Sequence, residues 1–326
     1  MKKLILWVML CGLVACGSDT QLFKKARLAT AQGQLTEALE LYTRVLRQDP
    51  NNFAAHINRG VVWERLPVKD AKERLKNRQN AEQDYLKAIA LNPTSAEAYN
   101  NLGALYIDMG RNAEAEANLA NALSFAPNYF TARMNHAIAL HRTGRFIEAL
   151  EDFNRAAILR PRDPLVFLNR ALAYYEAGQY ASAAEDLSYL ISLDPDNARA
   201  YLERARALIK MGYPANAYAD LETAVTIKPS YALAYYYMGD LMFRKGEVDQ
   251  ALGLLVRSKE LASKYVPTYE LMGDMLAMQD PVAATANYMV AAKLDPKHAA
   301  RYQAKINLMR SEEGRERVLS NRFFPR

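Results

Sequence analysis

Four histidines are the residues of this sequence best suited to metal binding or proton transfer, and their spacing argues against both roles. His136 and His141 lie five positions apart, so on a helix they would point about 140° away from each other. His56 and His298 stand alone. The chain also lacks the HExxH, CxxC, GxSxG and glycine-rich phosphate-loop motifs. We therefore expect no catalytic centre, no metal and no cofactor, and we expect most of the acidic residues at solvated helical positions.

Four asparagines have a spacing that could serve binding instead. Asn58, Asn101, Asn135 and Asn169 are separated by 43, 34 and 34 residues. An amide side chain donates and accepts at once, so such a row can pair with an extended peptide backbone. Four net hydrogen bonds would contribute about 2–6 kcal/mol, whereas association costs about 4–15 kcal/mol. The row could set the register of a partner, but apolar anchors would have to supply the remaining affinity.

An apolar stripe provides candidate anchors. Its spacing of three and four residues places each set on one helical face. The anchors that we expect to contact a partner are Leu168, Leu172, Tyr175, Tyr236 and Phe243. The alternative is that neighbouring segments bury this stripe, and the sequence leaves both interpretations open.

These residues recur because the whole chain is periodic. Three kinds of residue recur at a fixed spacing, which we call registers: prolines, small residues and alanines. In each register most neighbouring members are 34 residues apart, with single gaps of 43 or 33 residues. The small-residue register comprises Ala26, Gly60, Gly103, Ala137, Ala171, Ala205, Gly239 and Gly273. Each period carries two amphipathic helical patterns, which must stack on their neighbours to bury their apolar faces.

The residues of the third period resemble the tetratricopeptide repeat family. They match its pattern of aromatic, Leu, small and aromatic residues followed by Ala, a bulky residue, Ala and Pro, at Tyr99, Leu102, Gly103, Tyr106, Ala115, Leu119, Ala122 and Pro127. The resemblance implies an all-α fold, a right-handed superhelical solenoid of about eight helix-turn-helix repeats with a C-terminal capping helix. It also implies that the first helix of each repeat lines a concave groove. Asparagine is common in this register of the family, so a purely structural role for the four asparagines stays open.

The registers also set the expected boundaries. The repeats are predicted at residues 19–52, 53–95, 96–129, 130–163, 164–197, 198–231, 232–265 and 266–296. Residues 297–310 are expected to form the capping helix, and residues 311–326 a flexible basic tail. The second repeat contains an insertion at residues 66–78, which carries five basic and two acidic side chains. It is expected to be a charged protrusion that contacts anionic lipid or an acidic partner, or else a solvated loop or a longer helix pair.

The N-terminus has the pattern of a bacterial lipoprotein signal. Lys2 and Lys3 precede a short apolar run, and residues 13–16 read Leu-Val-Ala-Cys. This resembles the lipoprotein cleavage box, which implies a signal peptide at residues 1–15, acylation of Cys16 and a short linker at residues 16–18. Two or three acyl chains would hold the protein at a membrane, because each buried CH₂ contributes about 0.8 kcal/mol.

Together these features indicate a non-catalytic binding protein rather than an enzyme. The net charge of +6 is too small and too dispersed to predict nucleic-acid binding. The resemblance implies a protein or peptide partner in the concave groove and a location in the bacterial envelope, at the outer membrane and facing the periplasm. Assembly of a secretin, a type IV pilus or a secretion complex is the expected role. The alternative is a scaffold or binder for polysaccharide export or for peptidoglycan enzymes.

Overall fold

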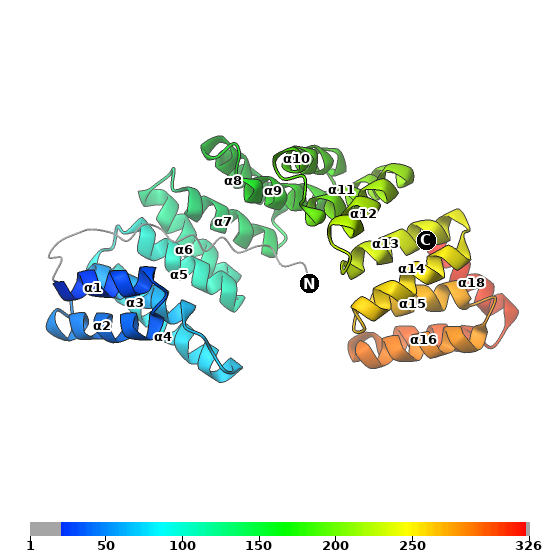
Figure 1. Cartoon of the computed structure of the whole chain (residues 1–326), viewed down its shortest axis with the longest axis horizontal. Coiled ribbons are helices and arrows are strands. Elements are labelled where there is room, and N and C mark those ends of the chain that lie inside the picture. Colours follow the sequence, from blue (N-terminus) through cyan, green and yellow to red (C-terminus); the bar gives the residue numbers. More distant parts are fainter. Residues whose placement is uncertain (1–20, 324–326) are drawn as a thin grey trace. The chain divides into compact units, whose positions relative to one another are not determined.

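The computed structural model describes residues 21–323, and side chains up to residue 320 (Figure 1). Within this range the chain forms eighteen α-helices and one short 3₁₀ helix, and it contains no strand. The all-α prediction is therefore confirmed. The signal segment 1–15, Cys16, the linker 16–18 and the tip of the tail at 324–326 lie outside the described residues.

The helices belong to two compact units, which meet between Gln179 and Tyr180. We call them the N-terminal unit and the C-terminal unit and describe each by itself. Their boundary lies inside the fifth predicted repeat, between its two helices.

The N-terminal unit contains four helix pairs and one further helix. The first helices of the repeats have odd numbers and the second helices have even numbers, and consecutive helices pack against each other. The elements are α1 (Gln21–Ala31), α2 (Leu35–Gln48), α3 (Phe53–Arg65), α4 (Ala71–Leu91), α5 (Ala96–Met109), α6 (Asn112–Phe125), α7 (Phe130–Arg142), α8 (Phe146–Leu159) and α9 (Pro164–Glu176).

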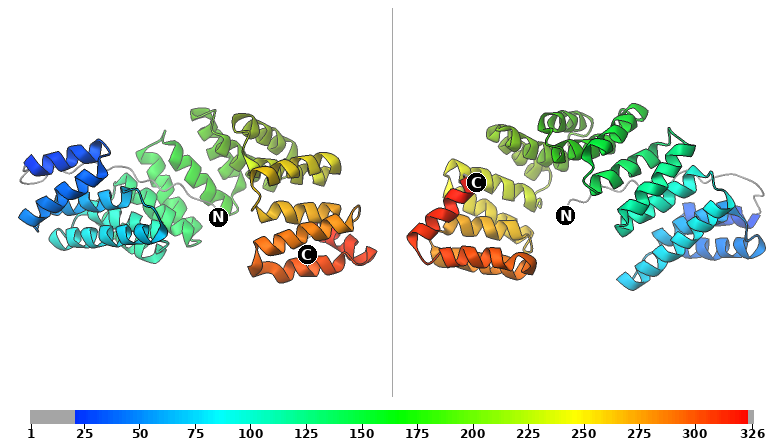
Figure 2. Two further views of the ribbon diagram at one scale, coloured as in Figure 1. Left: turned by 60° about the horizontal axis from the view of Figure 1, so that its bottom comes forward. Right: turned by 180° about the vertical axis from the view of Figure 1, so that it is seen from behind.

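The C-terminal unit continues the same alternation and ends in additional helices, which Figure 2 shows in orange and red. The elements are α10 (Tyr180–Leu193), α11 (Ala198–Met211), α12 (Pro214–Ile227), α13 (Ala232–Lys245), α14 (Val248–Leu261), α15 (Val266–Leu276), α16 (Pro281–Leu294), η1 (Pro296–His298), α17 (Ala299–Leu308) and α18 (Glu312–Phe323).

Local sequence signals explain where the helices of a repeat begin and end. At the start of the third repeat, the side chain of Ser95, the residue before α5, accepts a hydrogen bond from the Ala98 amide. Helix α5 ends at Met109, and the next residue, Gly110, has a φ of 77°, which is costly for residues with a Cβ. The chain thus turns after fourteen residues and starts the antiparallel partner α6.

Small residues let the paired helices approach closely, as the 34-residue register predicts. A Cβ built at Gly103 would lie 2.5 Å from Leu119 Cγ of the paired helix. At Gly60 the same construction would place a Cβ 2.5 Å from Tyr85 Cε1. Around these contacts the alanine register forms the centre of each pair and is fully buried at Ala38, Ala81, Ala115, Ala149, Ala183, Ala217, Ala251 and Ala284.

The C-terminal tail differs from the sequence-based expectation. Residues 312–323 form helix α18 rather than a flexible tail, and α18 packs against α17 and α15. Val318 is buried in the cluster that contains Tyr302 and Met309, and Leu319 packs against the cluster that contains Leu271. Because the mean hydropathy of this segment is low, the sequence did not indicate that these two apolar residues would pack against the repeats. The predicted capping segment forms η1 and α17, which packs on α16.

The insertion lengthens a helix. Residues 66–70 form a loop, and residues 71–78 are the first turns of α4, which has 21 residues where most second helices have 14. Among the interpretations open from the sequence, the structure matches the longer helix pair.

Candidate functional site: the asparagine face

The predicted binding row lies on one side of α3, α5, α7 and α9, which we call the asparagine face. Helix α7 packs against both α5 and α9. The Asn135 Nδ2 donates to Asn100 Oδ1 at 3.1 Å, and the Asn100 Nδ2 donates to Asn101 Oδ1 at 3.2 Å. Amides of adjacent repeats are thus linked through Asn100. Sequence reasoning missed Asn100 because it lies one position outside the 34-residue register.

Two asparagines of this face are unusual because their amides are enclosed and incompletely bonded. Asn135 and Asn169 are both 0% exposed. Asn135 Oδ1 has no hydrogen-bond partner, and neither Asn169 Oδ1 nor Asn169 Nδ2 has one. A buried polar group without a partner costs about 1–3 kcal/mol, and such groups are rare in folded proteins. Asn58 is also buried and Asn101 is half-buried, so the four predicted residues differ in how accessible they are.

The apolar anchors are largely buried within the fold. Leu168, Leu172 and Phe243 are 3%, 2% and 6% exposed, which is the alternative that the sequence left open. Tyr175 and Tyr236 are partly exposed. Contact of a partner with any of these five residues stays a prediction, and the two tyrosines offer the accessible surface for it.

The same register has a different character in the C-terminal unit. Glu203, Tyr237 and Leu271 stand where the asparagines would be. The Glu203 carboxylate is buried and forms an ion pair with Arg206. Tyr236 contacts the rings of Tyr237 and Tyr265 edge to face, with centroids 5.2 and 5.4 Å apart.

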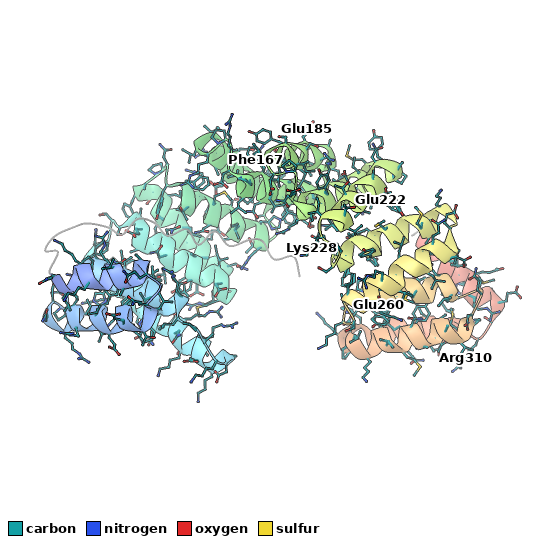
Figure 3. All side chains as sticks on the ribbon, in the orientation of Figure 1. Phe167, Glu185, Glu222, Lys228, Glu260 and Arg310 are labelled. Carbon is teal, nitrogen blue, oxygen red and sulfur yellow. The ribbon has the colours of Figure 1, made fainter. Side chains whose placement is uncertain are left out.

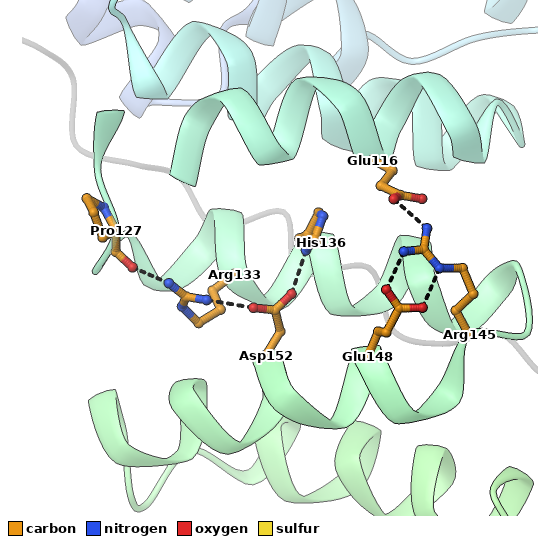
Figure 4. A network of polar contacts seen from close by, with 7 residues as sticks. All are labelled: Glu116, Pro127, Arg133, His136, Arg145, Glu148 and Asp152. Atoms are coloured by element: carbon orange, nitrogen blue, oxygen red, sulfur yellow. Dashed lines mark hydrogen bonds and ion pairs between the residues drawn. The ribbon is translucent and has the colours of Figure 1, made fainter. Parts of the chain in front are cut away.

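The second helices carry buried aspartates that the sequence analysis did not single out. Asp152 on α8 accepts from Arg133 Nη1 at 2.6 Å and contacts His136 Nδ1 at 2.5 Å (Figure 4). Arg133 also donates to the carbonyl of Pro127, at the end of the preceding repeat. This network ties the two helices of a repeat to the turn before them.

Equivalent ion pairs occur in other repeats. Asp84 binds both His56 and Arg59, and Asp220 binds Arg204 at 2.7 and 2.8 Å. Asp84, Asp152 and Asp220 are 3–8% exposed and are therefore exceptions to the solvated positions expected of most acidic residues. Their shared register on the second helices was the signal that could have revealed them.

Other acidic residues lie where the sequence places them. Glu185, Glu222 and Glu260 are exposed on the second helices α10, α12 and α14 of the C-terminal unit (Figure 3). Within the described residues no group of three His, Cys, Asp or Glu side chains could hold a metal ion. Among the helices of residues 21–323, none combines the length and the apolar character needed to cross a bilayer.

A cavity lies where the insertion meets the ends of α3 and α5. Its volume is about 360 Å³, and its lining mixes charged and apolar side chains: Trp63, Glu64, Arg65, Leu66, Val68, Arg74, Asn77, Arg78 and Asp108. Arg78 Nη2 forms an ion pair with the Asp108 carboxylate, and the Tyr85 hydroxyl donates to Glu64 Oε1 at 2.5 Å.

The electrostatics of this cavity reflect its partial enclosure. Part of the Glu64 side chain is exposed, yet burial of the carboxyl raises the pKa of Glu64 to about 7. The nearby Asp108 also raises this pKa, while the Tyr85 hydroxyl and Arg78 act in the opposite direction. Outside the cavity lining, burial lowers the pKa of the Arg142 guanidinium on α7, which donates to the Ile107 carbonyl of α5 at 2.5 Å.

Comparisons with known families agree with the repeat geometry. Tetratricopeptide repeat models match residues 26–66, 70–95 and 198–231, 84–117, 104–164 and 136–202. The chain is a tetratricopeptide repeat protein, and the predicted solenoid class is confirmed. Proteins of this fold typically are not catalysts.

Two curated relatives share only a segment with this chain. Tetratricopeptide repeat protein 6 of Homo sapiens is 32% identical over 132 residues, which are 33% of this chain and 25% of that protein. A probable UDP-N-acetylglucosamine–peptide N-acetylglucosaminyltransferase, SPINDLY of Arabidopsis thaliana, is 30% identical over 128 residues, which are 39% of this chain and 13% of that protein. The chain therefore spans a quarter or less of these relatives.

Solved structures extend the similarity in fold. A tetratricopeptide repeat protein from Parabacteroides merdae superposes with a TM-score of 0.57 at 22% identity and covers 77% of this chain and 96% of its own. Pseudomonas aeruginosa pilF gives 0.54 at 20% identity over 64% and 97% of the two chains. YrrB, described as a TPR protein with an unusual peptide-binding site, gives 0.52 at 20% identity over 60% and 97%.

Proposed function

We propose that this protein is a non-catalytic scaffold that binds an extended polypeptide along the asparagine face of its N-terminal unit. The face presents amide groups at the repeat spacing, and the half-buried Tyr175 stands at its α9 end. A backbone segment lying across α5, α7 and α9 would exchange hydrogen bonds with these amides while its side chains contact the aromatic ring. Asn135 and Asn169 are enclosed in the structure, so binding requires the side chains that cover them to move aside.

The observation that carries this proposal is the unsatisfied state of the amides. Asn169 has neither a donor nor an acceptor for its side chain, and Asn135 lacks a donor for Oδ1. A peptide backbone supplies one N–H and one C=O at each residue, which is the complement that these groups lack. The similarity in fold to YrrB, whose peptide-binding site is named in its description, supports the same class of ligand.

We further propose that an acylated Cys16 anchors the scaffold in the bacterial envelope, at the outer membrane and facing the periplasm. The lipoprotein-like residues 13–16 support this proposal. Assistance in assembling a secretin, pilus or secretion complex is the role that we propose there, and the similarity in fold to Pseudomonas aeruginosa pilF is compatible with it.

The binding proposal is tested by recovery of partners from the native host with the full chain. The triple variant Asn135→Ala, Asn169→Ala, Tyr175→Ala should lose specific partners that the unchanged protein retains. The matched control replaces two asparagines and one tyrosine away from the face, as Asn118→Ala, Asn121→Ala, Tyr213→Ala. Equal recovery by the triple variant and by the unchanged protein would contradict the proposal, provided that circular dichroism confirms folding.

The anchoring proposal has a separate test. The variant Cys16→Ser should move the protein from the membrane fraction to the soluble fraction of fractionated cells. A variant that still sediments with membranes would rule out attachment through Cys16, and peptide binding would be unaffected by that result.

A further inference from the structure

The cavity beside the insertion is a feature that the binding proposal has not used. Four segments line it: the end of α3, the loop at residues 66–70, the first turns of α4 with Arg74 and Arg78, and the end of α5 with Asp108. The loop and the turns of α4 belong to the insertion. Since the other repeats lack this insertion, the cavity is particular to the second repeat.

Two helices of the asparagine face, α3 and α5, also contribute residues to the cavity. Arg65 lies seven residues after Asn58 on α3, and Asp108 lies seven residues after Asn101 on α5. A separation of seven residues returns to the same side of a helix two turns later. A polypeptide that follows the asparagines toward the ends of α3 and α5 therefore arrives at this cavity.

The charges in the cavity favour an anion of single charge. Arg78 is paired with Asp108, but the Nη1 of Arg65 is buried without a hydrogen-bond partner. Arg74 has no carboxylate partner among the described residues. A guanidinium group matches the two oxygens of a carboxylate with parallel hydrogen bonds. Asp108 and Glu64 stand in the same lining, and they would repel a doubly charged phosphate more strongly than a carboxylate.

The remaining wall is apolar. Trp63, Leu66 and Val68 are partly exposed within the lining. A volume of about 360 Å³ accommodates one or two amino-acid residues. The site thus combines a cationic region with room for one apolar side chain.

We propose that this cavity binds a carboxylate of the polypeptide that occupies the asparagine face, together with an apolar side chain next to that carboxylate. The inference rests on the proposed function and names the chemistry of its ligand. The carboxylate is either the C-terminus of the partner or an Asp or Glu side chain, and the two sources share the same recognition by Arg65 and Arg74.

The chain contains its own reporter for this site. Its two tryptophans are Trp7 and Trp63, so the full chain with Trp7→Phe emits only from the cavity wall. We would titrate it at constant ionic strength with N-acetyl-leucine, N-acetyl-leucine amide, N-acetyl-glutamic acid α-amide and inorganic phosphate. A saturable change in Trp63 emission with N-acetyl-leucine, absent with its amide, is the expected result. An equal change with the glutamic acid derivative would assign the site to side-chain carboxylates as well.

The arginines are tested by neutral substitutions. Arg65→Gln and Arg74→Gln should each weaken the response to N-acetyl-leucine at least tenfold. The control is Lys76→Gln, which removes an exposed cation from the same helix outside the cavity lining and should change nothing. Arg74 is exposed, so its replacement remains informative if the Arg65 variant fails to fold.

The proposal is overturned if the acid and the amide give the same response, if phosphate binds more tightly than both carboxylates, or if neither arginine variant weakens binding. Such a failure is distinguishable from failure of the proposed function. Partner recovery could still depend on Asn135 and Asn169 while the emission of Trp63 does not change with any ligand. In that case the asparagine face binds a polypeptide, but no carboxylate of it occupies this cavity.

Discussion

The N-terminal and C-terminal units share one repeat but present different chemistry on equivalent faces. Three residues after each asparagine, the N-terminal unit has apolar residues, at Val61, Ala104, Ile138 and Leu172. The C-terminal unit has charged residues in this register, at Arg206, Asp240 and Asp274. Both units nevertheless use a glycine where the paired helices meet, at Gly103 against Leu119 and at Gly239 against Leu255.

This difference distinguishes the positions at which the repeat requires a particular kind of residue from those at which the residue can vary. Positions between the two helices of a pair are constrained by packing, so they recur in both units. Positions on the face of the first helices differ between the two units, although Asn135, Ile138 and Leu172 on this face are buried. Amides next to apolar residues suit a peptide backbone, whereas the ion pairs of the C-terminal unit satisfy their own charges.

The largest expected effect on stability comes from removing buried ion pairs. Such substitutions show whether the two units depend equally on these pairs. Asp152→Ala would leave Arg133 buried without its carboxylate, since both side chains are largely enclosed. We expect a loss of about 3–5 kcal/mol in the free energy of unfolding. Asp220→Ala in the C-terminal unit should cost less, because Arg204 is 24% exposed. Chemical denaturation monitored by circular dichroism measures both.

A surface pair provides the control for this prediction. Glu148 is bound by Arg145, and both side chains are largely exposed (Figure 4). Glu148→Gln should change stability by less than about 1 kcal/mol. A similar loss for Glu148→Gln and Asp152→Ala would contradict the structural role assigned to the buried network.

The close approach of paired helices predicts the next largest effect. Gly103→Ala would place a methyl group against Leu119, and overpacking of this kind costs about 1–3 kcal/mol. Gly239→Ala should behave similarly in the C-terminal unit, because its Cβ would lie 2.8 Å from Leu255 Cγ. Thermal unfolding of each variant tests the shared geometry.

Gly253 distinguishes packing from helix propensity. It lies within α14 with open space around its Cβ position, so Gly253→Ala should stabilise the protein by about 0.5–1 kcal/mol. Stabilisation by Gly103→Ala as well would show that the helices can separate without penalty.

The amides should matter for binding more than for stability. Asn169→Leu removes two unsatisfied polar atoms, so we expect stability to be unchanged or raised, while affinity for a captured partner falls about two- to tenfold. In the C-terminal unit, Tyr237→Phe alters the equivalent register and should leave that affinity unchanged. Isothermal titration with the recovered partner compares the two, and equal losses would remove the distinction between the units.

The smallest effect is a pH dependence in the N-terminal unit. The pKa of Glu64 is raised from 4.5 to about 7 in the folded protein, so folding favours its protonated form. The stability that this proton contributes is complete below the unfolded value and is lost as the pH rises through about 7. Glu64→Gln should therefore match the unchanged protein at pH 4 and exceed its stability at pH 8, by at most about 1 kcal/mol because solvent screens the exposed side chain. An advantage that is greater at low pH would contradict this assignment.

Periodic features were predictable from the sequence, and features outside the period were not. The helices α3, α5, α7, α9, α11, α13 and α15 begin where the 34-residue registers place the repeats. The role of Asn100 was not predicted, because its neighbour Asn101 occupies the 34-residue register, although Asn100 makes the contact to Asn135. Helix α18 was not predicted, because its contacts depend on two apolar residues in a polar segment. The burial of Leu168 and Leu172 was left open, since a helical face alone does not reveal what covers it.

Site-specific photo-crosslinking within one repeat tests the central claim most directly. Ala104 lies on the asparagine face of α5 between Asn101 and Asp108, and Ala117 is exposed on α6 of the same repeat. With benzoylphenylalanine at each position in the full chain in living cells, we predict a discrete partner adduct from position 104 and none from position 117. Adducts of the same partner at equal yield from both positions, or from position 117 alone, would contradict binding along the asparagine face.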